Sequence, residues 1–260
     1  MVDFIGEDLK SLSVDHLEFV AYLAEQSERY DDMAVVMQHL AVKQGTLTSK
    51  QRNYLSVAFK NSVGTKRSAW RTLKLSSENK DEKNAKLMEK IESFRKKISE
   101  ELVKICNKVI EILNNELIPK STDDESKVFY LKMVGDYYRY YAEVAEDYPE
   151  KKDEIIQGAS TAYLDAYKKG QAQLPKNNPI FLGLCLNYSV FLYEIVKDHE
   201  NAIKTAKMSL DDAVAIMEQA PADIFKDSTL ILQLIKDNLT LWTASDSCDD
   251  DIQRATERKD

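Results

Sequence analysis

The stretch SKVFYLKMVGDYYRYYAE, residues 126–143, decides the fold class of this chain. Its apolar and aromatic residues recur every three or four positions, and Gly135 is the only weak helix former in it, so the spacing predicts one helix. Four charged residues lie at i, i+4, i+7 and i+11 along one face: Lys132, Asp136, Arg139 and Glu143. A helix with this many aromatic residues is expected to lie in the interior. Charges there are costly unless they are paired or line a water-filled groove. The stripe is therefore a candidate site, although a solvated face with i,i+4 ion pairs would show the same pattern.

The composition favours helices throughout. The chain has 260 residues, of which 43% are hydrophobic and 31% charged, and it contains only 7 Gly and 5 Pro. This length is enough for a sizeable core, built as one large or two smaller units. Because sheets need many tight turns, the scarcity of turn formers favours long helices with short connections. No strong strand alternation is present, so the sequence predicts an all-α fold.

Prolines and turn residues divide the chain into nine expected helices. All five prolines lie where a helical pattern stops, because proline is poorly tolerated in a helix interior. The expected helices cover residues 13–26, 30–42, 49–75, 84–118, 126–143, 150–172, 179–196, 200–217 and 222–243. Their short links favour antiparallel neighbours. The polar segment 76–83 is expected to be a loop, and residues 245–260, which have almost no apolar content, a disordered, mostly acidic tail.

Charge and cysteine content disfavour several classes of function. A formal net charge of −8 and an isoelectric point near 5.1 argue against general nucleic-acid binding, which needs an excess of Lys and Arg on the contacting face. Cys106, Cys185 and Cys248 have no CxxC spacing and are expected to be reduced thiols. The three histidines are equally isolated, so neither a metal nor a cofactor is expected. No uninterrupted apolar run of membrane-spanning length and no signal peptide are found, which predicts a cytoplasmic protein without a membrane partner.

A second charged stripe lies in RNYLSVAFKNSVGTKRSAWR, residues 52–71. Lys60, Arg67 and Arg71 are spaced i, i+7 and i+11. Gly64 lies between them at i+4, so the three cations share a face with a residue that has no side chain, and no carboxylate of this stretch joins them. An arginine fork suits a doubly charged oxyanion because it donates two parallel hydrogen bonds. The face therefore suggests an anionic partner, although simple solvent exposure would explain it as well.

Two later helices each place one asparagine on an apolar face. In residues 178–195 that face holds Gly183, Asn187, Val190 and Glu194, with Leu186 beside it; in residues 227–244 it holds Leu230, Leu234, Asn238 and Leu241, with Ile231 and Trp242 beside it. A carboxamide both donates and accepts hydrogen bonds, which is what holding the backbone of an extended peptide requires. A lone asparagine on an apolar face is, however, also a common satisfied core group.

Together these stretches resemble the 14-3-3 family. AEQSERYDDMA, residues 24–34, and the literal matches ESKVFYLKM, GDYYRY, DSTLI and DNLTLWT occur in the family's order, and the resemblance covers residues 13–244. It implies a homodimeric adaptor for phosphoserine and phosphothreonine peptides, with no enzymatic activity. Each subunit is expected to be a cup of nine antiparallel helices with an amphipathic groove. Residues 13–118 would provide dimerisation and the groove floor, residues 119–244 the groove wall, and residues 1–12 an N-terminal extension.

The resemblance also implies which residues bind the phosphopeptide. The family's phosphate pocket falls on Lys60, Arg67, Arg139 and Tyr140, and the charged stripes select three of these independently. Asn187 and Asn238 would hold the peptide main chain, and Asp136 would orient the neighbouring cations. The remaining groove positions are Lys132, Glu194 and Trp242 as polar groups, and Leu186, Val190, Leu230, Ile231, Leu234 and Leu241 as an apolar wall.

Dimer contacts are implied in the same way. Between two copies, Arg29 is expected to pair with Glu101 and Asp32 with Lys97, while Leu23 packs against Phe94. A heterodimer with other isoforms is compatible with the same contacts. The expected partners are therefore phosphorylated client proteins and a second 14-3-3-like subunit.

Three positions depart from the family pattern. Some members carry a serine whose phosphorylation weakens the dimer, and the matching position here is Ala69, with Ser68 adjacent. This departure puts control of the dimer by phosphorylation in doubt. His16 stands where an acidic residue is usual and Val134 where a groove lysine is common, which puts one interface ion pair and some groove charge in doubt.

Two rival functions remain open at the level of sequence. Antiparallel helix pairs also suit a tetratricopeptide-like scaffold that binds peptides without phosphate, but signature residues do not recur at intervals of about 34 residues. An all-α enzyme of the isoprenoid-synthase type would need DDxxD metal clusters, and the pairs Asp31-Asp32 and Asp123-Asp124 lack the third acid. No nucleophile and base, P-loop or dinucleotide fingerprint is found.

Overall fold

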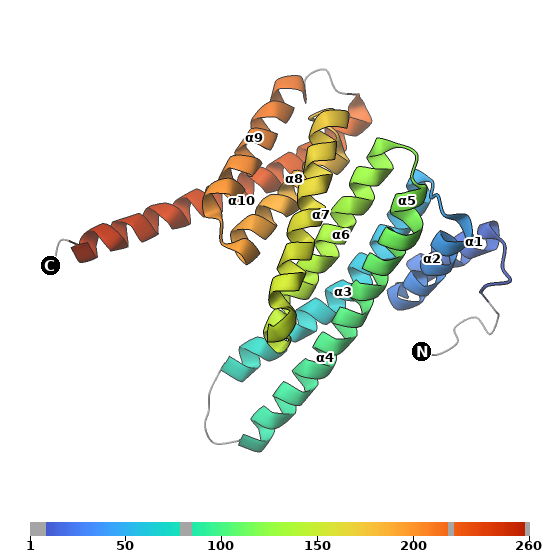
Figure 1. Cartoon of the computed structure of the whole chain (residues 1–260), viewed down its shortest axis with the longest axis horizontal. Helices are drawn as coiled ribbons and strands as arrows, with labels where there is room; N and C mark the ends of the chain where they lie inside the picture. Colours follow the sequence, from blue (N-terminus) through green and yellow to red (C-terminus); the bar gives the residue numbers. More distant parts are fainter. Residues whose placement is uncertain (1–8, 79–84, 218–220, 258–260) are drawn as a thin grey trace. The chain divides into compact units, whose positions relative to one another are not determined.

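The structure, a computed structural model, describes residues 9–78, 85–217 and 221–257, and for residues 78, 85, 223 and 245–257 the backbone alone. Helices account for nearly all of this part of the chain, which contains no strand, and the all-α prediction is confirmed (Figure 1). The helices are α1 (Val14–Gln26), α2 (Tyr30–Gln44), α3 (Ser49–Glu78), α4 (Ala85–Ile112), α5 (Ile118–Lys120), α6 (Asp124–Glu143), α7 (Lys152–Gln173), α8 (Pro179–Phe191), α9 (His199–Met217) and α10 (Ala222–Glu257).

Capping and turn residues set several helix ends. Ser13 caps α1, because its Oγ accepts a hydrogen bond from the His16 N–H at 3.2 Å. Gly45 ends α2 with a φ of +74°, a left-handed conformation that glycine adopts at little cost. Pro179 opens α8 directly after Asn178, whose side chain accepts hydrogen bonds from two N–H groups of the first turn at 2.9 and 3.2 Å. These ends lie within two residues of the positions expected from the sequence.

Short wide turns of π type join or extend two of the helices. Leu113–Leu117 links α4 to α5, so the chain is helical from residue 85 to residue 120, where one long helix over 84–118 is expected from the sequence. Leu192–Val196 extends α8 in the same way, and Lys197 ends it in a left-handed conformation. Counted with these π turns, and apart from the separate 3-10 turn Ala145–Asp147, the described residues form nine helical runs, as the sequence predicts.

The chain divides into two compact units. The first comprises residues 1–122 and 140–155, and in it α1 packs on α2, α2 on α3 and α3 on α4. Side chains that are almost completely buried fill the space between these helices: Leu17, Met33, Met37, Leu40, Leu55 and Leu102. Lys43 ties the segment before α1 to this unit, since its Nζ donates to the carbonyl oxygens of Lys10 at 3.2 Å and Leu12 at 2.6 Å.

The second unit comprises residues 123–139 and 156–260. One core cluster joins α6, α7 and α8 through Val128, Ala159, Tyr163, Ala166, Phe181, Leu184 and Cys185. Another joins α8 to α9 and α10 through Leu182, Ala202, Ala206, Leu232, Ile235 and Trp242. Because α8 is covered by these helices on more than one side, its sequence is apolar almost all round.

The run Pro179–Val196 is long and apolar enough to cross a membrane by length and composition alone. The run is not uninterrupted, because Asn187 and Glu194 lie in it. Phe181, Leu182 and Cys185 are buried in the two core clusters, so this helix packs inside the second unit.

Three expectations about chain organisation are changed by the structure. α3 extends to Glu78, so the expected loop begins at least three residues later, and its residues 79–84 lie outside the described part, as do residues 1–8 of the N-terminal extension. α10 continues to Glu257, where a disordered tail was expected from residue 245; this segment holds charged residues of both signs with Gln and Ala, which are compatible with a helix. Residues 258–260 are not described. Finally, residues 140–155 belong to the first unit, not to the part that follows residue 119.

Two glycines inside helices should respond to alanine in opposite ways. A Cβ added at Gly64 in α3 would meet nothing within 4 Å, whereas one at Gly135 in α6 would lie 2.7 Å from the Tyr163 ring. Since alanine is the better helix former by about 1 kcal/mol, Gly64→Ala is expected to raise Tm by about 2–4 °C. Gly135→Ala should lower Tm, because overpacking costs about 1–3 kcal/mol. Thermal unfolding followed by circular dichroism measures both, and equal shifts would contradict this account of the two glycines.

Candidate functional site

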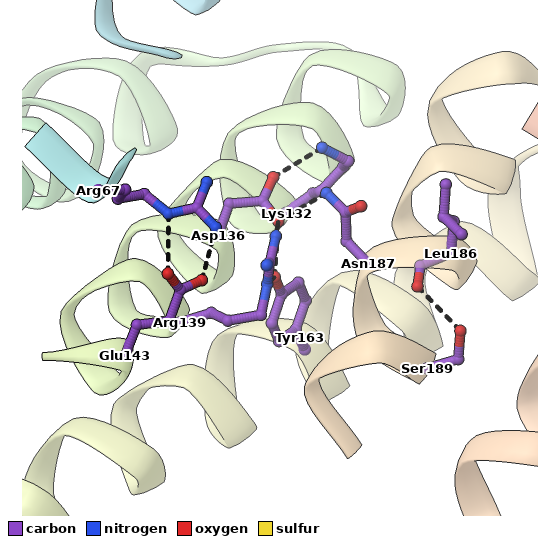
Figure 2. A network of polar contacts seen from close by, with 9 residues as sticks. All are labelled: Arg67, Lys132, Asp136, Arg139, Glu143, Tyr163, Leu186, Asn187 and Ser189. Carbon is purple, nitrogen blue, oxygen red and sulfur yellow. Dashed lines mark hydrogen bonds and ion pairs between the residues drawn. The ribbon is translucent and has the colours of Figure 1, made fainter. Parts of the chain in front are cut away.

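The basic face of α3, made by Lys60, Arg67 and Arg71, is joined by a carboxylate from α6. Lys60 and Arg71 are exposed and Arg67 is half-buried. Glu143 accepts hydrogen bonds from Arg67 Nε at 3.0 Å and Nη2 at 2.6 Å (Figure 2). It also accepts one from Arg71 Nη2 at 2.9 Å. Arg67 and Arg71 therefore receive an acidic partner from the end of another helix in the same unit.

Tyr140 fixes the orientation of the Arg67 side chain. The guanidinium carbon of Arg67 lies 4.1 Å from the centroid of the buried Tyr140 ring, a cation–π contact. With the ring on its face and Glu143 on its edge, the guanidinium is held in one position. Cys106 is within electrostatic reach of this pair, but burial raises the pKa of its thiol, and the Arg67 charge opposes that shift only in part. The thiol is therefore a neutral neighbour of the site.

Asp136 is the centre of a polar network in the second unit. Its Oδ2 accepts a hydrogen bond from Lys132 Nζ at 2.7 Å. Its Oδ1 accepts from the Tyr163 hydroxyl at 2.6 Å, from Asn187 Nδ2 at 2.7 Å and from Arg139 Nη2 at 3.4 Å. Arg139 is tied in a second time, because its Nε donates to the Tyr163 oxygen at 3.1 Å. Figure 2 shows that α6, α7 and α8 all contribute a side chain to this network.

The network keeps Asp136 ionised although it is buried. Burial by itself would raise the pKa of the Asp136 carboxyl, but the charges of Lys132 and Arg139 and the hydrogen bonds it accepts outweigh burial, and the pKa lies below its usual value. Burial raises the pKa of Tyr163 well above the ordinary tyrosine value, and the adjacent Asp136 adds to that shift. Tyr163 is therefore a fixed hydrogen-bond donor to the carboxylate.

The helices α8 and α10 present the two asparagines and the expected apolar wall. Leu230, Leu234 and Leu241 on α10 are exposed by 67%, 46% and 65%, which is unusual for leucines that share one helix face. Leu186, Val190 and Ile231 are half-buried. Trp242 is buried and stacks on Tyr193 with 4.6 Å between ring centroids, so most of its indole packs inside the unit.

Among the residues that the structure describes, no group of three or more His, Cys, Asp or Glu is placed to hold a metal ion.

Comparisons with known proteins agree on one family, since a family model described as 14-3-3 protein matches residues 20–243. The chain belongs to the 14-3-3 family. It is 46% identical to 14-3-3 protein zeta of Bombyx mori over 242 residues, which cover 92% of this chain and 97% of that protein. It is 45% identical to 14-3-3 protein 3 of Entamoeba histolytica over 234 residues, covering 90% and 96%. It is also 45% identical to 14-3-3 protein beta/alpha of Homo sapiens over 241 residues, covering 92% and 97%.

Members of the 14-3-3 family are phosphopeptide-binding adaptors, not enzymes, and the comparisons support that adaptor function here. Nothing in them favours a tetratricopeptide-like scaffold. The closeness of the relatives over almost the whole chain makes this a whole-protein likeness and not one confined to a motif.

The structure groups the sequence-predicted 14-3-3 residues into two sets. Lys132, Asp136, Arg139 and Asn187 share the network of the second unit, and Arg67 contacts Tyr140 in the first. The remaining predicted groove residues lie on α3, on α8 and its π extension, and on α10: Lys60, Leu186, Val190, Glu194, Leu230, Ile231, Leu234, Asn238, Leu241 and Trp242.

Two residues with central contacts were not assigned to the 14-3-3 site from the sequence. Glu143 is the last member of the charged stripe on α6, so the sequence pattern had already marked it, but the family resemblance gave it no role. Tyr163 lies on α7, and no sequence pattern around it predicts a role in the site. The one indirect sign is Gly135, where the lack of a side chain lets the Tyr163 ring approach α6.

Replacing Asp136 by asparagine should destabilise the protein most at neutral pH. The variant keeps the shape but removes the carboxylate with which both Lys132 and Arg139 pair, at a cost of about 3–5 kcal/mol. Because the folded-state pKa of Asp136 is lowered, the carboxylate stabilises the fold fully above an unfolded pKa of about 4, and this contribution is lost as the pH falls through the lower folded pKa. Urea unfolding at several pH values should show the difference from wild type shrinking below about pH 4. A difference that is independent of pH would rule out this role for the carboxylate.

Proposed function

We propose that this 14-3-3 protein binds peptides phosphorylated on serine or threonine and that Lys60, Arg67, Arg139 and Tyr140 take the phosphate. One observation carries the assignment: each of the two arginines is already fixed by neighbours in its own unit. Arg67 is fixed by Tyr140 and Glu143, and Arg139 by Tyr163 and Asp136, in the contacts described above. Guanidinium groups that are fixed before binding lose little freedom when a ligand arrives.

The chemistry of the four groups suits a phosphate monoester. Such a group carries nearly two negative charges at neutral pH and three acceptor oxygens. Arginine can donate two parallel hydrogen bonds to it, lysine adds a point charge, and the Tyr140 hydroxyl adds a neutral donor. Each charge-assisted hydrogen bond contributes about 1.5–3 kcal/mol before the costs of ordering are subtracted. The mechanism is binding alone, and no catalytic activity is proposed.

The rest of the peptide is proposed to lie along α8 and α10. Asn187 and Asn238 hold its main chain, and the exposed leucines of α10 supply an apolar wall with Leu186, Val190 and Ile231. Asn187 already donates to Asp136 through Nδ2, so its carbonyl oxygen is the group best placed to accept a hydrogen bond from a peptide N–H. Lys132 and Glu194 add charge at the edge, and the buried Trp242 supports the wall from behind by stacking on Tyr193.

We further propose that the protein acts as a dimer, either with a second copy or with another isoform, and that it works in the cytoplasm. In α1, Phe19, Tyr22 and Leu23 are exposed by 59%, 42% and 45% and share one face, and on α4 Phe94 is exposed by 54%. A groove of about 850 Å³ lies in the same unit and is lined from α2, α3 and α4 by residues that include Asp32 and Glu101. Exposed aromatic residues and a groove in the same unit favour burial against a second subunit.

Within one chain, Arg29 already pairs with Asp32, with 2.6 Å between Nε and Oδ2. The expected pairs between subunits, Arg29 with Glu101 and Asp32 with Lys97, must therefore share these groups with an internal ion pair. This sharing lowers the net contribution of each intersubunit pair. It places more of the expected dimer energy on the apolar contacts of Leu23 and Phe94, and on Phe19 and Tyr22, which the sequence did not single out.

Truncation of either arginine should abolish measurable phosphopeptide binding. Arg139→Ala and Arg67→Ala each remove a fixed donor pair, at a cost of about 2–5 kcal/mol, or roughly thirtyfold or more in affinity. Lys66→Ala is a matched control, because Lys66 precedes Arg67 but pairs with Asp31 at 2.8 Å on another face of α3. Titration calorimetry with one phosphoserine peptide and its unphosphorylated form gives the affinities. Equal affinity of the wild type for both peptides would favour a phosphate-independent scaffold instead.

Reversing one interface charge should weaken the dimer at two symmetry-related places. Glu101→Arg brings like charges together on both sides of a two-fold axis, so monomers should become visible at low micromolar concentration. A singly phosphorylated peptide should bind almost as before, while a doubly phosphorylated one should lose an avidity factor of roughly 10² to 10⁴. Adding Arg29→Glu should restore part of both properties. If Glu101→Arg stays dimeric at nanomolar concentration in sedimentation experiments, the apolar contacts dominate and the charge assignment fails.

A further inference from the structure

Glu143 occupies a position that its own helix disfavours. It is the last residue of α6, where the negative end of the helix dipole lies and a carboxylate is destabilising. Its side chain is nevertheless only 12% exposed, because it pairs with Arg67 and Arg71. The local cost is therefore offset by contact with the basic face of α3.

The N–H groups that Glu143 uses are those that a phosphate would use. Arg67 gives it Nε and Nη2, the two parallel donors of its fork, while Tyr140 covers the face of the guanidinium at 4.1 Å. Arg71 gives it Nη2. An anion that approaches Arg67 must therefore bind beside this carboxylate or replace it. In both cases the negative charge of Glu143 opposes the ligand.

We propose that Glu143 is the internal counter-ion of the phosphate site. It orients Arg67 and Arg71 before a ligand arrives, and by its charge it weakens the binding of anions. The inference rests on the proposed phosphopeptide function and deepens it. Its consequence is specificity: a bare phosphate is held weakly, so stable binding needs the peptide contacts along α8 and α10 as well.

The charge of Glu143 should leave a signature that a positioning role would not. A fixed charge acts through the potential at the binding site, so its effect on binding free energy is proportional to the charge of the ligand. A phosphate monoester carries nearly two charges at neutral pH, and a phosphate diester carries one. Removing the Glu143 charge should therefore strengthen monoester binding by about the square of the factor for the diester. Loss of a residue that only positions Arg67 would instead weaken both ligands.

The experiment compares one fluorescent peptide in two forms, with phosphoserine and with its O-methyl phosphodiester. Dissociation constants are measured by anisotropy at about pH 7.5 and fixed salt, where the monoester is almost fully ionised. In Glu143→Gln, which keeps the shape and removes the charge, the monoester is expected to bind about tenfold more tightly and the diester about threefold. If circular dichroism shows that this variant does not fold, Glu143→Ala makes the same change of charge.

Two control variants separate the charge of Glu143 from other effects. Glu146→Gln removes a carboxylate of the same unit that pairs with Lys74 at 2.6 Å and Arg95 at 3.1 Å and touches no member of the basic face. It should leave both affinities within about twofold of wild type, because screening limits distant charges. Glu143→Asp keeps the charge on a shorter side chain and should show no gain that scales with ligand charge.

The outcomes distinguish a failure of the counter-ion role from a failure of the proposed phosphopeptide function. Weaker binding in Glu143→Gln, unchanged binding, or equal gains for the two ligands would each overturn the counter-ion role while the phosphopeptide function stands. If the wild type fails to prefer the phosphoserine peptide over the unmodified serine peptide, the proposed function itself fails.

Discussion

The buried carboxylate of Asp136 constrains the second unit more than any other single group. A charge inside a protein is tolerated only when it is paired and hydrogen-bonded, and here the partners come from three helices: Lys132 and Arg139 on α6, Tyr163 on α7 and Asn187 on α8. Each must reach the carboxylate at hydrogen-bond distance, so the three helices cannot slide past one another. Gly135, next to Asp136, makes the arrangement possible because it lets the Tyr163 ring lie against α6.

Much of the fold could be predicted from the sequence because its signals are local. Ser13, Gly45 and Pro179 mark helix ends through capping and backbone preference, and the three- and four-residue spacing identifies the stripes on α3 and α6. The contacts between stripes could not be predicted in this way. Arg67 and Glu143 are separated by 76 positions and Asp136 and Tyr163 by 27. Periodicity identifies a face of a helix but not the face that it meets, and for Tyr140 only the family resemblance supplied a role.

Local rules are broken at two positions that bear on the basic face of α3. Gly64 weakens the interior of α3 although nothing occupies the space that a Cβ would fill, and Glu143 places a negative charge at the unfavourable end of α6. Neither choice improves packing or helix stability. Departures of this kind are expected where binding and folding make different demands on the same residue, and both lie on the basic face or in contact with it.

Cys106 and Cys185 are buried, and their burial determines how readily their thiols can be oxidised. Peroxides and electrophiles react with the thiolate, and burial raises the pKa of Cys185 to about 12 and that of Cys106 further still. At pH 7 only about one Cys185 thiol in 10⁵ is ionised, which makes it nearly inert. Cys106, although it lies within electrostatic reach of Arg67 and Glu143, is equally protected. Oxidation of Cys106 is therefore not expected to disturb the groups proposed to hold phosphate.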